Sequence, residues 1–204
     1  MIKMKEAEIK ILASFFPRAE KEYTIKEIEK ISAYSHERVY TTLLNLAKQG
    51  YLTKKRVGKT YTFKLNLKKD LILPFFYFLT ERNKRFFDSL KIFEKKLLTE
   101  FIKQIYSPDL ISCIVFGSYA KGEQREDSDI DILCIVRKRY DIEKIALSLA
   151  HKYGKSISPV IISIKDFLNM KKENPTFFLE LIEFGVILYG REMFYELVYG
   201  RCYG

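Results

Sequence analysis

The sequence of 204 residues contains no tryptophan, five prolines and only three cysteines. Cys113, Cys134 and Cys202 are odd in number and widely spaced, which excludes the pattern of a disulfide-stapled domain or of a zinc site. We expect them to be reduced and mostly buried thiols of a cytoplasmic protein. Hydrophobic residues make up 48% of the chain and charged residues 30%, which is typical of a folded protein rather than a disordered one.

Long hydrophobic runs are also absent. The longest apolar run, residues 71–79, is far shorter than the roughly 20 residues that a membrane-spanning helix needs. The chain does not begin with a basic segment, an apolar stretch and a small-residue cleavage site, so we expect no secretory signal. These absences predict a cytoplasmic protein that does not partner with a membrane.

The net charge of +10 is unevenly distributed along the chain. Residues 1–70 hold 16 basic and 8 acidic residues, a net charge of +8, whereas residues 71–204 hold 20 and 18, a net charge of +2. A concentrated basic surface attracts the phosphate backbone of nucleic acids. The alternative is a lysine-rich surface that is simply solvated.

Three helices are predicted in the first fifty residues. Apolar residues at helical spacing between 7 and 16 predict the first, which Pro17 ends. Thr24 and Glu27 have the spacing of a capping box that opens the second, and Ser35 can cap a third that runs to about Gln49. The inward side chains that we expect are Ile25, Ile28 and Ile31 in the second helix and Val39, Leu43 and Leu46 in the third.

A hairpin is predicted after these helices, because residues 51–56 and 60–65 alternate in polarity around Val57-Gly58-Lys59. Three helices followed by a hairpin resemble a winged helix-turn-helix domain over residues 6–67. The resemblance implies binding to double-stranded DNA, with the third helix in the major groove and the hairpin, or wing, against the backbone. A protein-docking or dimerising module is the alternative. The candidate base-reading residues are Arg38, Thr41, Thr42 and Asn45, and the candidate phosphate contacts are Lys54, Lys55, Arg56 and Lys59.

The segment from residue 71 to residue 106 is predicted to form one long amphipathic helix. Its apolar residues recur at steps of three and four, which is more typical of a core or a dimer interface than of a ligand site, and a homodimer is therefore possible. We expect three parts: a winged helix-turn-helix domain over 1–70, a helical connector over 71–108 and a third domain over 109–204. The apolar stripe consists of Phe86, Leu90, Phe93, Leu97 and Phe101.

Two predicted strands in the third domain enclose the residues that suggest chemistry. Residues 111–116 form an apolar run that ends at Gly117-Ser118, and the second strand begins near Asp129. Asp129 and Asp131 are two positions apart, so both carboxylates lie on one face of the strand. Two like charges on one face are costly unless a cation neutralises them.

The string Gly117-Ser118-x-Ala120-x-Gly122, followed by Ser128-Asp129-x-Asp131, resembles the signature of the DNA polymerase beta-like nucleotidyltransferase superfamily, in particular its minimal nucleotidyltransferase branch. The resemblance covers residues 109 to about 190 and implies a small α/β domain with a mixed sheet, so the whole chain is expected to be α+β. It also implies that Gly117 and Ser118 bind the phosphates of an NTP and that Asp129 and Asp131 are catalytic and hold Mg²⁺. We interpret Lys121 and Arg125 as solvated loop charges. The remaining elements expected are a helix over 141–153, a strand over 156–164, a helix over 175–184 and a strand over 185–190.

One departure from this signature affects the expected activity. Active relatives usually have a third carboxylate on the strand after the intervening helix, but residues 155–164 contain no acid. Asp166 is the nearest substitute in sequence, followed by Glu180 and Glu183. The first hypothesis is therefore a nucleotidyltransferase that acts on an unknown acceptor, for which a protein is one candidate, and that the DNA-binding domain targets or regulates. The alternatives are a non-catalytic, nucleotide-sensing transcriptional regulator that binds DNA, and an interaction module whose two domains dock protein.

Overall fold

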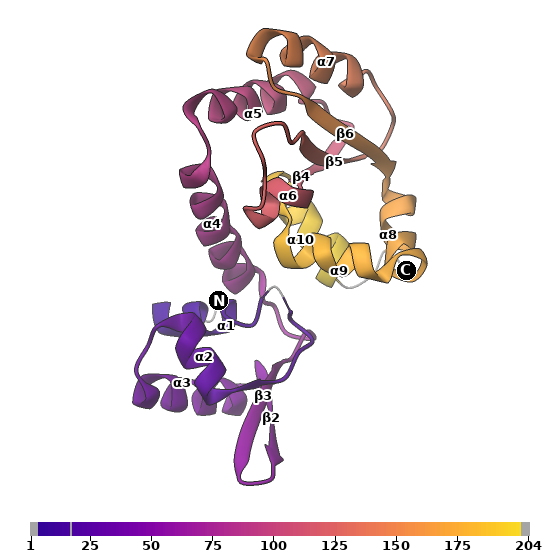
Figure 1. The fold of residues 1–204 in the computed structure, drawn as a ribbon. Coiled ribbons are helices and arrows are strands. Elements are labelled where there is room, and N and C mark those ends of the chain that lie inside the picture. The colour runs from indigo at the N-terminus through magenta and orange to yellow at the C-terminus, as the bar shows by residue number, and fades with distance from the viewer. Residues whose placement is uncertain (1–3, 17, 201–204) are drawn as a thin grey trace. The chain divides into compact units, whose positions relative to one another are not determined.

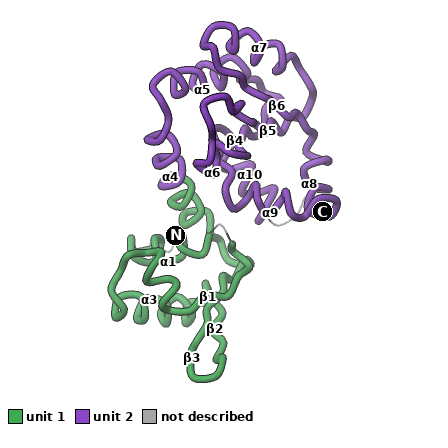
Figure 2. The backbone as a smooth tube through the Cα atoms, in the orientation of Figure 1, with its two compact units in different colours: residues 1–80 green, residues 81–204 purple. Residues whose placement is uncertain are grey.

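The computed structural model describes residues 4–16 and 18–200, so the predictions for Pro17 and Cys202 lie outside the described residues. The chain is a mixed α+β protein of two compact units, residues 1–80 and 81–204 (Figure 2). The division falls within the segment that we predicted as a helical connector. No helix of the described ranges is both long and apolar enough to cross a membrane.

In the described residues of unit 1, three helices and a small antiparallel sheet precede the first half of a fourth helix, which continues into unit 2 (Figure 1). The β2–β3 hairpin turns at Gly58 and Lys59, since Val57 pairs with Thr60. The short strand β1, which the sequence did not predict, adds to the other edge of β3 and gives the order β1-β3-β2. The elements are α1 (Glu6–Ala13), β1 (Tyr23–Thr24), α2 (Ile25–Ser32), α3 (His36–Lys48), β2 (Leu52–Val57) and β3 (Thr60–Leu65).

Local sequence signals explain the boundaries of these helices. The capping box at α2 is confirmed, because the Thr24 amide donates to Glu27 Oε2 at 2.8 Å and the Glu27 amide donates to Thr24 Oγ1. Ser35 precedes α3 as expected, but its side chain makes no capping hydrogen bond. Gly50 follows α3 with φ of +79°, a conformation that glycine adopts without strain.

The buried face of α3 agrees with the prediction, since Val39, Leu43 and Leu46 are fully buried. The inward position predicted for Ile31 is wrong, because its side chain is 52% exposed. Residues four apart share a helix face, and the buried pair of α2 is Ile28 and Ser32. Ile31 therefore points away from the core.

The single long helix predicted over 71–106 is also wrong. The structure has two helices, α4 (Ile72–Ser89) and α5 (Ile92–Ile105). At the break, Lys91 has an extended backbone and its amide donates to Glu94 Oε2 at 2.8 Å, which starts a new helix. Consequently Phe93 is 38% exposed, whereas the other four residues of the apolar stripe are buried in unit 2.

Unit 2 is built on a four-stranded mixed sheet with the order β6-β5-β4-β7. Strands β5 and β6 are parallel, and β4 is antiparallel to both β5 and β7. Helices α8 and α10 were not predicted. The elements are β4 (Leu110–Val115), α6 (Gly117–Lys121), β5 (Ile130–Val136), α7 (Ile142–Tyr153), β6 (Ile157–Ser163), α8 (Ile164–Glu173), α9 (Pro175–Phe184), β7 (Val186–Tyr189) and α10 (Arg191–Tyr199).

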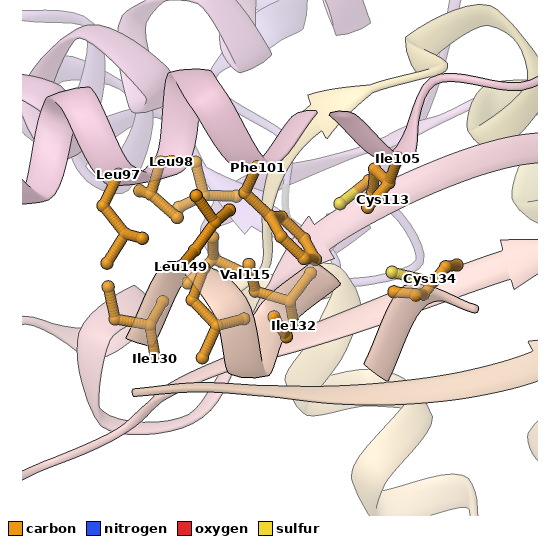
Figure 3. Close-up of a cluster of buried hydrophobic side chains, with 14 of the residues drawn as sticks. Leu97, Leu98, Phe101, Ile105, Cys113, Val115, Ile130, Ile132, Cys134 and Leu149 are labelled. Carbon is orange, nitrogen blue, oxygen red and sulfur yellow. The ribbon is translucent and has the colours of Figure 1, made fainter. Parts of the chain in front are cut away.

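The core of unit 2 forms where α5 and α7 cover the sheet (Figure 3). Strands β4 and β5 are buried along nearly their whole length, which explains why their sequences are almost continuously apolar. Phe101 of α5 and Leu149 of α7 belong to the same buried cluster as Ile132 of β5. This packing holds the ends of β4 and β5 in place, and the chain between these ends carries the candidate site.

We predict that Phe101→Ala lowers the free energy of unfolding by about 3–5 kcal/mol, because it leaves a cavity in this core. The matched control is Phe93→Ala, which replaces the same residue type on the same helix at a partly exposed position. It should lower the free energy of unfolding by less than about 1 kcal/mol. Urea denaturation of both variants measures the difference. Equal losses would contradict the placement of the two rings.

Candidate functional site

The candidate site forms where β4 ends against β5. The Phe116 amide donates to the backbone oxygen of Asp131 at 3.0 Å, which extends the ladder of β4 and β5 by one residue pair. Gly117 then turns the chain with φ of +68° and begins the five-residue helix α6. Strand β4 therefore delivers the Gly117-Ser118 turn directly beside Asp131.

Glycine is required at position 117 for two reasons. Its positive φ is a conformation that residues with a side chain rarely adopt. In addition, a Cβ atom on Gly117 would lie 2.6 Å from Oδ2 of Asp131. The absence of a side chain thus lets the Asp131 carboxylate approach the backbone of the turn.

Two carboxylates and one hydroxyl meet at this place. Asp129 is exposed just before β5, whereas Asp131 is half-buried within β5. Ser158 of β6 is the register partner of Asp131, and its Oγ donates to Oδ2 of Asp129 at 3.1 Å. Strand pairing therefore brings the two predicted acids together with Ser158, one of two positions, with Val160, that we considered for the missing third carboxylate.

The electrostatics of the pair suit a cation. Burial raises the pKa of Asp131, and the charge of Asp129 raises it further. Within the described residues, no group of three or more His, Cys, Asp or Glu side chains could hold a metal ion. The two carboxylates fit one Mg²⁺, which prefers oxygen ligands and takes its other ligands from phosphates and water.

The loop between α6 and β5 is held by contacts that the sequence did not predict. Lys155, just before β6, is only 8% exposed and its Nζ donates to the backbone oxygen of Glu126 at 2.8 Å. The same ammonium lies 5.2 Å from the centre of the Tyr119 ring, and the Tyr119 hydroxyl donates to Glu94 at 2.7 Å. A buried lysine therefore ties the loop to α6, and α6 is tied in turn to α5.

The interpretation of Lys121 as a solvated loop charge is wrong. Its Nζ lies 2.7 Å from Oε1 of Glu180 on α9, and this hydrogen bond raises the pKa of Lys121. Arg125 is exposed, and its backbone amide donates to the Ser128 hydroxyl at 2.9 Å. Glu180, one of the candidate substitutes for the missing carboxylate, is thus partly exposed and joined to the helix that follows Gly117.

The structure does not place Asp166 near the two acids. Asp166 caps α8, where its Oδ2 accepts from the backbone amide and the hydroxyl of Ser163, and these bonds lower its pKa. Ser163 pairs with Val136, five residues beyond the Asp131–Ser158 pair, which corresponds to about 16 Å along the strand. The hypothesis that Asp166 supplies the missing carboxylate is therefore wrong.

The candidate base-reading residues all lie on α3 of unit 1. Arg38, Thr41 and Asn45 are exposed, and Thr42 is half-buried. The Arg38 guanidinium stacks 4.2 Å above the Tyr34 ring, and the Thr41 hydroxyl donates to a backbone oxygen of its own helix. The side-chain amide of Asn45 donates to the carboxylate of Glu8, which also accepts from the side-chain amide of Gln49.

The candidate phosphate contacts are exposed on the β2–β3 hairpin. The Lys54 ammonium lies 3.8 Å from the centre of the Tyr61 ring. Lys55 lies 3.7 Å from Glu22, and Arg56 donates to the oxygen of Gly58 at the turn, beside Lys59. All four cations therefore remain accessible to solvent.

Comparisons with known proteins concern mainly the second unit. Residues 96–193 match the family model described as "Polymerase beta, Nucleotidyltransferase". A solved structure described as "Structure of TrmBL2, an archaeal chromatin protein, shows a novel mode of DNA binding" aligns with 85% of this chain and 71% of that chain. Its sequence identity is 17% and its TM-score is 0.27, which is too low to indicate a shared fold.

Three similar proteins of Methanocaldococcus jannaschii each bear the name "Putative protein adenylyltransferase". MJ1305 is 38% identical over 49% of this chain and 74% of its own length. MJ0604 is 36% identical over 47% of this chain and 98% of its own length. MJ0141 is 35% identical over 43% of this chain and 90% of its own length. The family match spans the Gly117 turn and both aspartates. Together with the similarity to these proteins, it shows that the chain belongs to the polymerase beta nucleotidyltransferase family.

Proposed function

We propose that this chain is a cytoplasmic, Mg²⁺-dependent nucleotidyltransferase that transfers a nucleotidyl group from an NTP to an acceptor hydroxyl. The observation that carries the proposal is the turn at Gly117, whose backbone approaches the Asp131 carboxylate where a side chain would collide. A turn of backbone without a side chain, beside two acids, offers amide donors to a triphosphate and oxygen ligands to its counterion. Family membership supports the reaction class.

Each residue of the site has a distinct role in this proposal. Asp129 and Asp131 would hold Mg²⁺, which would offset the negative charge of the phosphates during the displacement. The backbone of Gly117 and the hydroxyl of Ser118 would donate hydrogen bonds to phosphate oxygens. Lys155 would keep the loop that leads to Asp129 in place, through its bond to Glu126.

The nature of the acceptor follows from the names of the similar proteins. All three bear the name "Putative protein adenylyltransferase". By extension, we propose ATP as the nucleotide and a hydroxyl of a partner protein as the acceptor.

Replacing both Asp129 and Asp131 by Asn should abolish Mg²⁺-dependent ATP binding, because the double variant loses both carboxylate ligands. Isothermal titration calorimetry measures binding, and circular dichroism checks that the fold is retained. The matched control is Asp166→Asn, on the same unit but at the far end of β6, which should bind normally. Unchanged binding by a folded double variant would refute the proposed site.

A second candidate function is a non-catalytic regulator that senses a nucleotide. Ser158 favours this candidate, because it is paired with Asp131 and bonded to Asp129, where the sequence signature leads us to expect a third carboxylate. A serine hydroxyl is a poor base and a weak metal ligand. General-base assistance contributes about a hundred- to ten-thousandfold to a rate, so its loss would leave nucleotide binding with slow transfer.

We therefore predict ATP binding with weak or undetectable transfer to generic acceptors, and a gain of transfer in Ser158→Asp. The gain is expected because the new carboxylate would lie beside Asp129. Release of labelled pyrophosphate measures the reaction, and Val160→Asp, two residues along β6 and 44% exposed, is the control without gain. Rapid transfer by the unaltered chain would contradict this role of Ser158.

For the first unit we propose a winged helix-turn-helix domain that binds double-stranded DNA and targets or regulates the second unit. The order of three helices and a hairpin, the net charge of +8 over residues 1–70 and the accessible cations of the hairpin support it. Helix α3 would lie in the major groove. Because Glu8 holds the Asn45 amide, Arg38, Thr41 and Thr42 are the better candidates for contacts with bases.

Replacing Lys54, Lys55 and Arg56 together by Ala should flatten the slope of log affinity against log salt by about two to three units. Each lost phosphate contact leaves one counterion unreleased. The control removes the same charge elsewhere, by replacing Lys165, Lys171 and Lys172 of α8, which are exposed. Fluorescence anisotropy with a labelled duplex gives the slopes. If the chain binds no DNA at low salt, the protein-docking alternative takes its place.

A further inference from the structure

Two buried cysteines face each other across the central strands of unit 2. Cys113 of β4 is the direct register partner of Cys134 of β5. Both are free thiols with no exposed surface, and both belong to the core cluster in Figure 3. The proposed nucleotide chemistry does not use either of them.

The strand register shows which kind of pair they form. The Phe116 amide donates to the oxygen of Asp131, so Phe116 and Asp131 are a hydrogen-bonded pair. In an antiparallel ladder, hydrogen-bonded and non-hydrogen-bonded pairs alternate. The pairing continues without a bulge from Val115 back to Ser112, so Cys113 and Cys134, three steps away, are a non-hydrogen-bonded pair.

Non-hydrogen-bonded pairs have the geometry that a disulfide needs. Their Cα atoms lie about 4.5 Å apart and their side chains are close, and disulfides join Cα atoms about 4.4 to 6.8 Å apart. The bond would therefore form without displacing β4 or β5. It would join the strand that leads into Gly117 to the strand that carries Asp131.

We propose that Cys113 and Cys134 form a cross-strand disulfide when the chain folds in the presence of a small-molecule disulfide such as oxidised glutathione. One thiolate attacks the oxidised glutathione and releases one glutathione thiolate, which leaves a mixed disulfide on the chain. The second thiolate attacks the chain's sulfur and releases a second glutathione. The two cysteines are oxidised, and one glutathione disulfide is reduced to two thiols.

The timing of this oxidation follows from burial. The thiolate is the attacking species, and burial raises the pKa of Cys113, with a contact from the Cys134 thiol as the second cause. The folded core thus disfavours the thiolate and excludes the oxidant. The disulfide consequently forms while the chain folds. Once folded in the reduced form, the protein undergoes thiol–disulfide exchange with oxidised glutathione only slowly.

The test uses the full chain with Cys202→Ser, so that only Cys113 and Cys134 can pair. After refolding in a glutathione buffer, followed by alkylation, mass spectrometry should show the loss of two hydrogens and no alkylated thiol. Peptide mapping should link the segments of Cys113 and Cys134. The reduced folded chain in the same buffer should remain reduced for hours, and a chain that also carries Cys134→Ala should show no internal disulfide.

The oxidised and reduced forms of this same chain should differ in Tm, with the oxidised form higher by roughly 5–10 °C. A folded product with two free thiols, or with glutathione adducts only, would overturn the proposal. So would an oxidised form with a lower Tm, since the bond would then strain the sheet. The same chain can also be produced in an oxidising compartment of a host cell. Mass spectrometry of that product then shows, without a refolding step, whether the disulfide has formed.

Discussion

The structure of the second unit depends on the close approach between Gly117 and Asp131. A side chain at position 117 would collide with the carboxylate, and the backbone there has a positive φ. The neighbouring bond from the Phe116 amide to the Asp131 oxygen fixes the register of β4 and β5 at this point. Because the register is fixed, the turn, both aspartates and Ser158 of the parallel strand β6 come together at one end of the sheet.

This arrangement is costly for the folded chain. Two carboxylates lie close together, and the half-buried one has a raised pKa, first because of burial and then because of its neighbour. The core of the same unit, in contrast, stabilises the fold through apolar packing of α5 and α7 on buried strands. Local unfavourable electrostatics within an otherwise well-packed domain are typical of functional sites, where a ligand offsets the cost. The family match covers the same stretch of chain.

The sequence could predict features that depend on near neighbours. The capping box of α2, the stop at Gly50 and the shared face of Asp129 and Asp131 each follow from a few consecutive residues. The break between α4 and α5 could not be predicted, because Leu90 continues the apolar period and conceals the cap made by Glu94. The contacts of Lys155, Glu180 and Ser158 join segments that are far apart in the chain, so no local pattern predicts them.

In the proposed function, Ser158 would separate nucleotide binding from nucleotidyl transfer. A carboxylate at this position would place three negative charges together, which raises the cost of the site without a cation. The serine instead donates a hydrogen bond to Oδ2 of Asp129. The hydroxyl therefore adds no third charge beside the two carboxylates that would hold Mg²⁺, and it offers no strong base to an acceptor. In this arrangement the acceptor's own surroundings would have to supply the base, so transfer would depend on a specific partner rather than on the nucleotide site alone.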